Sequence, residues 1–251
     1  MEIKAIITDL DRTLLRTDKG ISPYTVEVLK QCRERGIFVM TASARPLRDI
    51  RAFGDFFQFD AVTATNGAVI DLPDRRLEYG IRRESGEEIL SRLLRFPDAF
   101  LSVETSGGLY SNRDIPVWNP VVYEDFPKLP ENVVTYKILA SSGERALYDG
   151  ISGILTDDVY HTVSNHELVQ IMSREATKWN GVCQMLACFG ISQREAIYFG
   201  DDNDDIEPIR NCGTGVAVSN AIPAVLNAAD CIADSNDEDG VARFIERNLL
   251  K

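Results

Sequence analysis

The sequence has few of the residues that build zinc centres and disulfide frameworks. Its 251 residues include only two histidines, His161 and His166, and five cysteines, none of which forms a CxxC pair. Zinc and iron sites usually take histidine or cysteine ligands, so we expect neither kind of site. An odd number of cysteines is typical of free thiols in a reducing compartment, and it predicts a cytoplasmic protein.

Long apolar runs and positive charge are also scarce. No segment approaches the ~18 apolar residues of a membrane-spanning helix. The first residues, Met1-Glu2-Ile3-Lys4, lack the features of a secretory signal. Lys and Arg total 27 against 39 for Asp and Glu, which gives a net charge of −12. This charge argues against nucleic acid or an anionic membrane as the main partner. A phosphorylated ligand would therefore need a local cation or a metal ion.

The two ends of the chain share one hydrophobic pattern. Apolar β-branched runs alternate with amphipathic helices, which predicts a doubly wound parallel α/β sheet. The expected strands are 3–8, 37–41, 61–64, 196–199 and 214–218, and the expected helices are 23–36, 46–53, 179–190 and 206–211. The two halves therefore indicate one α/β core.

The middle of the chain follows a different pattern, with hairpins in place of crossovers. The expected helices are 84–96 and 144–155, and the expected strands are 100–104, 109–112, 133–140, 159–164 and 168–172. Hairpins build antiparallel sheets. We therefore predict an inserted α+β cap on an antiparallel sheet at residues 80–172, within a core formed by residues 1–79 and 173–251.

Polar clusters follow four of the expected strands. Parallel sheets bind ligands at the carboxyl ends of their strands, so these clusters are expected to meet at one edge. They are Asp9-Leu10-Asp11-Arg12-Thr13, Ser43-Ala44-Arg45-Pro46, Asn66-Gly67 and Gly200-Asp201-Asp202-Asn203-Asp204-Asp205. Carboxylates that crowd at one edge predict a hard divalent cation, which takes oxygen ligands. A solvated acidic loop is the less favoured explanation of the last cluster.

The first cluster is spaced for phosphoryl chemistry. Asp9 could attack phosphorus and form an aspartyl-phosphate, while Asp11 could protonate the leaving oxygen and later activate water. Considered alone, the two acids fit an ordinary capping loop equally well. Ser43 could likewise hold phosphate oxygens at a helix start or simply cap the helix. Lys178, a lone cation before a helix, could bind phosphate or remain solvated.

Together these motifs resemble the haloacid dehalogenase superfamily, in its Cof-type branch with a C2-type cap. The matching segments are Asp9–Thr13, Ser43–Pro46, Asn66-Gly67-Ala68, Lys178, Gly200–Asp205, Gly215–Ala221 and Ser235–Val241. The resemblance implies an α/β core with an inserted cap and Mg²⁺ as the cofactor. Because Asp11 is an acid, it implies phosphoryl transfer rather than dehalogenation.

The resemblance also implies a role for each matching residue. Asp9 would be the nucleophile and a metal ligand, Asp11 the acid/base whose backbone carbonyl binds Mg²⁺, and Asp201 the remaining metal ligand. The phosphate would contact Ser43, Lys178, Asp204 and the backbone N–H groups of Leu10 and Ala44. The supporting residues would be Thr13, Arg45, Asn66 and Asp205. Ala44 stands where the family usually has glycine, and Asp204 where it usually has asparagine.

The predicted function is Mg²⁺-dependent hydrolysis of small phosphorylated metabolites, with sugar phosphates as the expected class. The reaction would pass through an aspartyl-phosphate, and the cap would close over the site and select the leaving group. Two alternatives stay open. In a phosphomutase or phosphotransferase an alcohol takes the phosphoryl group in place of water. A non-catalytic protein that binds phosphorylated metabolites is the other, and Ala44 and Asp204 are its support.

Overall fold

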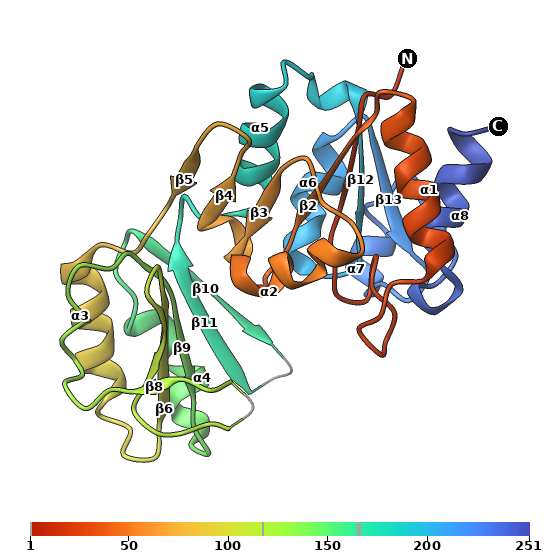
Figure 1. Cartoon of the computed structure of the whole chain (residues 1–251). Coiled ribbons are helices and arrows are strands. Elements are labelled where there is room, and N and C mark those ends of the chain that lie inside the picture. The colour runs from red at the N-terminus through yellow and green to blue at the C-terminus, as the bar shows by residue number, and fades with distance from the viewer. Residues whose placement is uncertain (1, 117, 165–166) are drawn as a thin grey trace. The chain divides into compact units, whose positions relative to one another are not determined.

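The computed structural model describes residues 2–116, 118–164 and 167–251, so His166 lies outside the described residues. The chain divides into two compact units (Figure 1). The core unit comprises Met1–Leu77 and Thr177–Lys251, and the cap unit comprises Glu78–Ala176. The insertion predicted at 80–172 falls inside the cap unit. Among the described residues no helix has the length and apolar character needed to cross a membrane.

The core unit is built on an eight-stranded sheet in the order β14-β13-β12-β1-β2-β3-β4-β5. Its parallel strands are β1 (Ala5–Thr8), β2 (Phe38–Ala42), β3 (Val62–Ala64), β12 (Ala196–Gly200), β13 (Thr214–Val218) and β14 (Cys231–Ala233). From β1 the chain moves to β2 and β3 on one side. After the cap unit it returns to β12 and moves to β13 and β14 on the other side. This confirms the predicted doubly wound sheet.

Helices flank this sheet, and two of them begin at a residue whose side chain caps the helix. The helices are α1 (Pro23–Glu34), α2 (Leu47–Arg51), α5 (Lys178–Cys188), α6 (Ile206–Asn211), α7 (Pro223–Leu226) and α8 (Gly240–Asn248). Of these, α7 and α8 were not predicted from the sequence. Ser22 caps α1 and accepts a hydrogen bond from the Thr25 N–H, with proline in the first turn. Thr177 caps α5 in the same way through the Asn180 N–H. Figure 1 shows α1 and α8 side by side.

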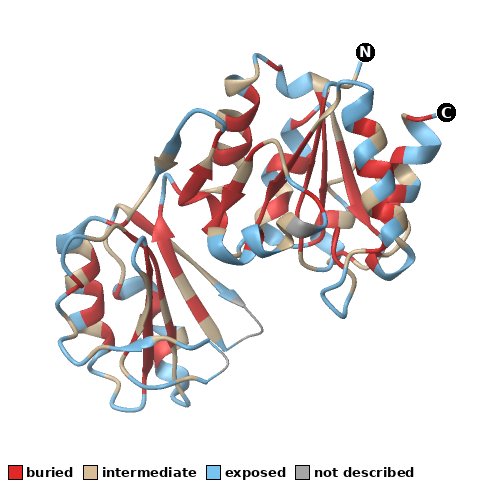
Figure 2. Cartoon of the chain, in the orientation of Figure 1, coloured by how far each residue is buried: buried red, intermediate tan, exposed pale blue. Residues whose placement is uncertain are grey.

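The central strands are the most buried part of the core unit (Figure 2). Every residue of β1 and of β12 is buried. Tyr198 and Phe199 of β12 are among the largest side chains with no exposed surface. Burial on both faces is what the continuous apolar runs of a parallel sheet predict. The strand ends, where polar residues follow, are therefore held by a rigid framework.

The sequence missed several short elements of the core unit. After β3, the chain turns back into β4 (Val69–Asp71), which is antiparallel to β3, and then forms β5 (Arg76–Glu78). These strands of three residues are too short to show a hydrophobic period. The helix expected at 46–53 ends earlier, because α2 continues as a 3-10 turn over Ala52–Asp55.

The cap unit has a six-stranded sheet in the order β10-β11-β9-β6-β7-β8. Its strands are β6 (Phe100–Thr105), β7 (Gly108–Ser111), β8 (Val121–Val122), β9 (Thr135–Ser141), β10 (Val159–Ser164) and β11 (Leu168–Ser173). The two predicted hairpins, β6-β7 and β10-β11, are confirmed as antiparallel pairs. The helices are α3 (Arg83–Leu93) and α4 (Arg145–Asp149). The helix expected at 144–155 breaks at Gly150, after which a 3-10 turn follows.

One face of the cap sheet builds the hydrophobic core of this unit. Leu101 and Val103 of β6, with Ile138 of β9, pack into a cluster that includes Leu90 and Leu93 of α3. Alternate residues on each strand point to the opposite face. His161 belongs to β10 in this unit. The unit agrees with the predicted α+β cap, and its sheet is antiparallel except for the parallel β7-β8 pair.

Candidate active site

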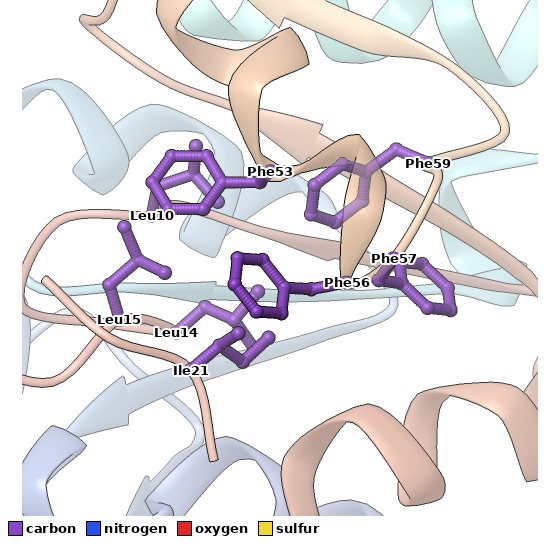
Figure 3. Close-up of a pocket in the computed structure, with 8 residues that line it drawn as sticks. All are labelled: Leu10, Leu14, Leu15, Ile21, Phe53, Phe56, Phe57 and Phe59. Atoms are coloured by element: carbon purple, nitrogen blue, oxygen red, sulfur yellow. The ribbon is translucent and has the colours of Figure 1, made fainter. Parts of the chain in front are cut away.

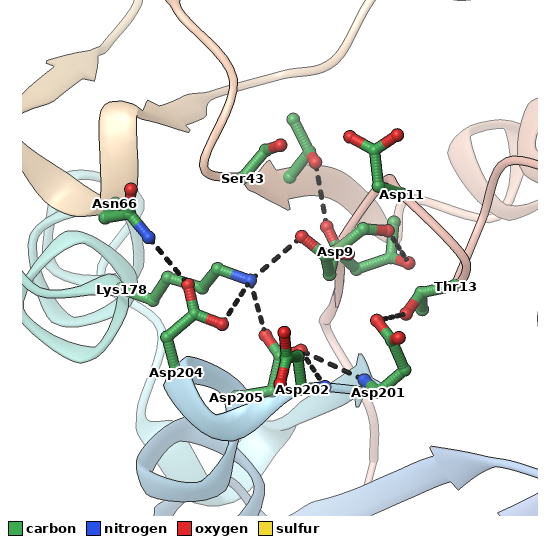
Figure 4. Close-up of polar contacts among 12 residues, drawn as sticks. Asp9, Asp11, Thr13, Ser43, Asn66, Lys178, Asp201, Asp202, Asp204 and Asp205 are labelled. Atoms are coloured by element: carbon green, nitrogen blue, oxygen red, sulfur yellow. Dashed lines mark hydrogen bonds and ion pairs between the residues drawn. The ribbon is translucent and has the colours of Figure 1, made fainter. Parts of the chain in front are cut away.

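Polar side chains from distant parts of the chain meet beyond the carboxyl ends of the central strands (Figure 4). Asp9 follows β1, Asn66 follows β3 and Asp201 follows β12. The Thr13 hydroxyl donates a hydrogen bond of 2.9 Å to Asp201 Oδ1, which joins two loops 188 residues apart. The Lys178 ammonium donates to Asp9 Oδ1 at 2.9 Å. The predicted convergence of these loops at one edge of the sheet is therefore found.

Lys178 occupies the centre of the acidic group. It is the first residue of α5, and only 2% of its side chain is exposed. Its Nζ lies 2.9 Å from Asp9 Oδ1, 3.1 Å from Asp204 Oδ1 and 2.7 Å from Asp205 Oδ1. Burial opposes the charge, but the three carboxylates raise the pKa of Lys178 well above its usual value. A solvated lysine, the alternative reading of this residue, is therefore wrong.

Asp205 is buried and uses both of its oxygens within the protein. Oδ1 accepts hydrogen bonds from Lys178 Nζ and the Tyr198 hydroxyl. Oδ2 accepts from the backbone N–H groups of Asp201 and Asp202. With four donors around it, this carboxylate fixes the loop after β12 and the position of Lys178. The sequence predicted Asp205 as a supporting residue but missed Tyr198, whose polar hydroxyl within a buried strand was the available signal.

Asp9 and Asp201 fit the predicted metal ion. One oxygen each from Asp9, Asp201 and Asp205 lie within 4.8 Å of one another, and all three residues are buried. Burial raises the pKa of Asp201 to about 7 and the pKa of Asp9 well above its usual range. Buried carboxylates that repel one another are stabilised by a hard cation with oxygen ligands. Because Asp205 is already saturated by its donors, Asp9 and Asp201 are the better ligands.

The Asp11 carboxylate points away from this group (Figure 4). Arg45 donates to Oδ2 through Nε at 2.6 Å and to Oδ1 through an Nη atom at 2.8 Å. Lys19 Nζ donates to Oδ1 at 2.8 Å. Against the effect of burial, these hydrogen bonds lower the pKa of Asp11 to about 2. The structure therefore does not bring this carboxylate to the other acids, and the sequence missed Lys19 as its partner.

The loops around the site are anchored by apolar packing and local hydrogen bonds. Ser43 is buried, and its Oγ accepts a hydrogen bond from the Arg45 N–H, whereas Ala44 is exposed. The Arg45 guanidinium lies 5.2 Å from the centre of the Phe53 ring. Beside Leu10 is an apolar pocket (Figure 3). It is lined by Leu10, Leu14, Leu15, Ile21, Phe53, Phe56, Phe57 and Phe59.

The family of the chain follows from comparison with known proteins. A family model described as haloacid dehalogenase-like hydrolase matches residues 6–245. The chain belongs to the haloacid dehalogenase-like hydrolase family. The family that the motifs resemble is thus confirmed.

The relatives of this haloacid dehalogenase-like hydrolase include proteins that are named as phosphatases. It is 28% identical over 269 residues to "Putative phosphatase YxeH" of Bacillus subtilis, with 98% of each sequence covered. It is 24% identical to 5-amino-6-(5-phospho-D-ribitylamino)uracil phosphatase YitU of Bacillus subtilis, with 96% of each covered. A solved haloacid dehalogenase-like hydrolase of B. subtilis shares its fold, with a TM-score of 0.86 at 22% identity over 98% of this chain and 100% of the other. The relatives support a phosphatase, as the sequence predicted.

A strained loop follows β3 and contacts the rest of the site in this haloacid dehalogenase-like hydrolase. Thr65, Asn66 and Gly67 have φ angles of 51°, 57° and 105°. The Thr65 N–H donates to the Arg45 carbonyl, and the Asn66 side-chain amide donates to Asp204 Oδ2 at 2.8 Å. Left-handed residues that are not glycine cost free energy and concentrate at functional sites. The loop therefore ties the segment before α2, which carries Arg45, to the acidic loop.

Gly67→Ala is expected to destabilise the protein by about 2–4 kcal/mol. A Cβ at Gly67 would lie 2.1 Å from the carbonyl oxygen of Thr177, the residue that caps α5. Urea unfolding of this variant and of Gly36→Ala measures the effect. Gly36 also has a positive φ, but a Cβ there would meet no atom within 4 Å. Equal losses in the two variants would show that the contact with Thr177 is unimportant.

Proposed function

We propose that this phosphatase hydrolyses small phosphorylated metabolites, with Mg²⁺ as cofactor and Asp9 as the nucleophile. The observation that carries the proposal is the buried group of Asp9, Lys178 and Asp201 beyond the end of β1 and β12. Lys178 orients Asp9 through a hydrogen bond of 2.9 Å. The same ammonium is placed to stabilise negative charge on a phosphoryl group beside Asp9.

The chain's own residues account for both chemical steps. Asp9 attacks phosphorus as the bond to the leaving oxygen breaks, and Asp11 gives that oxygen a proton. Water then cleaves the aspartyl-phosphate while Asp11 takes the proton of the water. Arg45 and Lys19 hold Asp11 as a carboxylate, so proton uptake follows its release from these two partners.

Asp9, Asp201 and the backbone carbonyl of Asp11 would hold the metal ion. When bound, Mg²⁺ supplies the positive charge that lets an anionic nucleophile and a phosphate dianion approach each other. The supporting observation in this chain is the donor set, since Asp9 and Asp201 are two neighbouring carboxylates that are largely shielded from water. Such a donor set favours Mg²⁺ over zinc, which prefers nitrogen and sulfur ligands.

Side chains of the cap unit favour a substrate whose leaving group carries several hydroxyl groups. On the face of its sheet opposite the hydrophobic cluster, the buried Glu104 of β6 lies directly opposite the buried Lys137 of β9. Lys137 Nζ donates to Gln170 Oε1 of β11 at 2.9 Å. An ammonium, a carboxylate and an amide complement vicinal hydroxyl groups, each of which donates and accepts. The relative YitU is named for a substrate with a phosphorylated ribityl chain, which belongs to this chemical class.

A panel of phosphate esters, assayed with Mg²⁺ and with a chelator, tests the proposal. We expect hydrolysis of p-nitrophenyl phosphate and faster hydrolysis of some sugar phosphates, both lost with the chelator. Transfer of the phosphoryl group to a sugar acceptor would identify a phosphomutase or phosphotransferase. Binding of phosphorylated metabolites without turnover of any ester would identify the non-catalytic protein and contradict the proposal.

Lys137→Met is expected to lower kcat/KM for the preferred sugar phosphate by ~10-fold or more, because the proposed selection of hydroxylated leaving groups by the cap unit depends on this charged donor. The rate with p-nitrophenyl phosphate should stay within ~2-fold, since its leaving group carries no hydroxyls that need such a donor. Lys128→Met, at an exposed position of the cap unit, is the matched control. A parallel loss for both esters would assign Lys137 a structural role.

A further inference from the structure

Three carboxylates surround the Lys178 ammonium, which donates hydrogen bonds to Asp9 and Asp205 and forms an ion pair with Asp204. An ammonium has three N–H groups, and Lys178 Nζ has Asp9, Asp204 and Asp205 within 3.1 Å. A phosphate oxygen can therefore accept a hydrogen bond from Lys178 only after one carboxylate has moved away. We propose that Asp204 is this exchangeable partner, and that it sets the affinity of the site for phosphate. The inference rests on the proposed phosphatase function.

The other two carboxylates are held too firmly, or are needed too directly, to leave. Asp9 is the proposed nucleophile and must stay beside Lys178. Asp205 has no exposed side-chain surface and accepts from Tyr198 and two backbone N–H groups in addition to Lys178. Its departure would strand several buried polar groups. Exchange at Asp205 is therefore excluded on energetic grounds.

Asp204 differs from both in its surroundings. Its side chain is 25% exposed, and its distance to Lys178 Nζ, 3.1 Å, is the longest of the three. Water can therefore solvate the carboxylate after it leaves Lys178. A phosphate oxygen, also an anionic acceptor, can take its place at the ammonium. Asp204 thus competes with phosphate for a place beside the Lys178 ammonium.

Asn66 holds Asp204 in the competing position. Its side-chain amide donates to Asp204 Oδ2 at 2.8 Å, while Asp204 Oδ1 faces Lys178. The Asn66 backbone is fixed as well, since its N–H donates to the Ser43 carbonyl and its φ is 57°. Asn66 is therefore a positioning residue that acts through Asp204.

The exchange would also help product release. After hydrolysis, inorganic phosphate remains beside Lys178, and the return of Asp204 to the ammonium displaces it. The carboxylate also repels the phosphate dianion while the two are close. The natural residue at position 204 therefore weakens phosphate binding and favours turnover at high product concentration.

Calorimetric titration of inorganic phosphate in the presence of Mg²⁺ tests the exchange. Asp204→Asn keeps an acceptor for Asn66 but removes the charge, and we expect its Kd for phosphate to fall by roughly 10-fold. KM for a phosphate ester should fall in parallel, with a smaller change in kcat. Asp202→Asn removes the same charge from an exposed position of the same loop, so its Kd should stay within ~2-fold of wild type.

Asn66→Gly provides a second test, because glycine tolerates the left-handed backbone at this position. It should tighten phosphate binding in the wild-type background and have no effect in the Asp204→Asn background. Equal or weaker phosphate binding by Asp204→Asn, or identical effects of Asn66→Gly in both backgrounds, would overturn the exchange. Failure of the wild-type protein to hydrolyse any ester would instead count against the proposed function itself.

Discussion

Asp9→Asn is expected to lower kcat by at least ~10³-fold, because an amide oxygen is too weak a nucleophile to form a phosphoryl bond. The fold should survive, since Asp9 lies just beyond the end of β1 and an amide oxygen can still accept from Lys178. Steady-state hydrolysis of p-nitrophenyl phosphate measures the loss. Mass spectrometry after a short reaction should find phosphate on the Asp9 peptide of the wild-type protein and none on the variant.

Asp18→Asn is the control for this experiment. Asp18 is an exposed acid nine positions after Asp9 in the chain. Its Oδ1 accepts a hydrogen bond from the Gly20 N–H, and the side-chain oxygen of an asparagine can accept the same bond. The kcat of the Asp18→Asn variant should stay within ~2-fold of the wild-type value, as expected of a surface substitution. Substantial turnover by Asp9→Asn, or covalent phosphate on a different residue, would disprove the role of Asp9.

The identity of the site residues was predictable from the sequence because the strands before them are strongly patterned. Ile6-Ile7 before Asp9 and Tyr198-Phe199 before Asp201 are apolar runs of buried strands. Once these strands are parallel neighbours, the residues that follow them must lie at one edge. This argument brings Asp9 and Asp201 together across about three quarters of the chain, and the parallel register of β1 with β12 confirms it.

The orientation of side chains at the site was not predictable in the same way. Asp11 has its rotamer set by Arg45 and Lys19, which reach it from a neighbouring loop and from its own loop. No local pattern encodes such a choice, because it depends on where other loops end in space. Asp204 is a second case. The sequence indicated only that an amide was missing, whereas the structure shows a carboxylate shared between Lys178 and Asn66.

The metal-free protein is expected to lose stability as the pH rises from about 5 to about 8. Asp201 has its pKa raised to about 7 by burial, against a value of 3.8 for an ordinary aspartate. Between these two values the folded carboxyl holds a proton that the unfolded chain has lost. The free energy of unfolding therefore falls with pH, by about 2–3 kcal/mol across this range from Asp201 alone.

The raised pKa of Asp9 acts in the same direction, whereas Lys178 stays protonated throughout this range and adds no pH dependence. Mg²⁺ binds the folded state and should raise Tm by mass action. The rise should be larger at pH 8 than at pH 5, because a protonated carboxyl group is a poor ligand. Thermal melts in chelator and in excess Mg²⁺ at several pH values measure both effects.

The Asp201→Asn variant isolates the contribution of the Asp201 carboxyl group to the pH dependence of stability. Without a titrating side chain at position 201, the metal-free variant should show a flatter pH profile than wild type and lose most of its response to Mg²⁺. Thr13 can still donate its hydroxyl hydrogen bond to the asparagine oxygen, so the loop after β12 should keep its place. If the stability of the metal-free wild-type protein rises between pH 5 and pH 8, Asp201 is ionised in the absence of Mg²⁺. If Mg²⁺ raises Tm equally at pH 5 and pH 8, Asp201 is not a ligand of the ion.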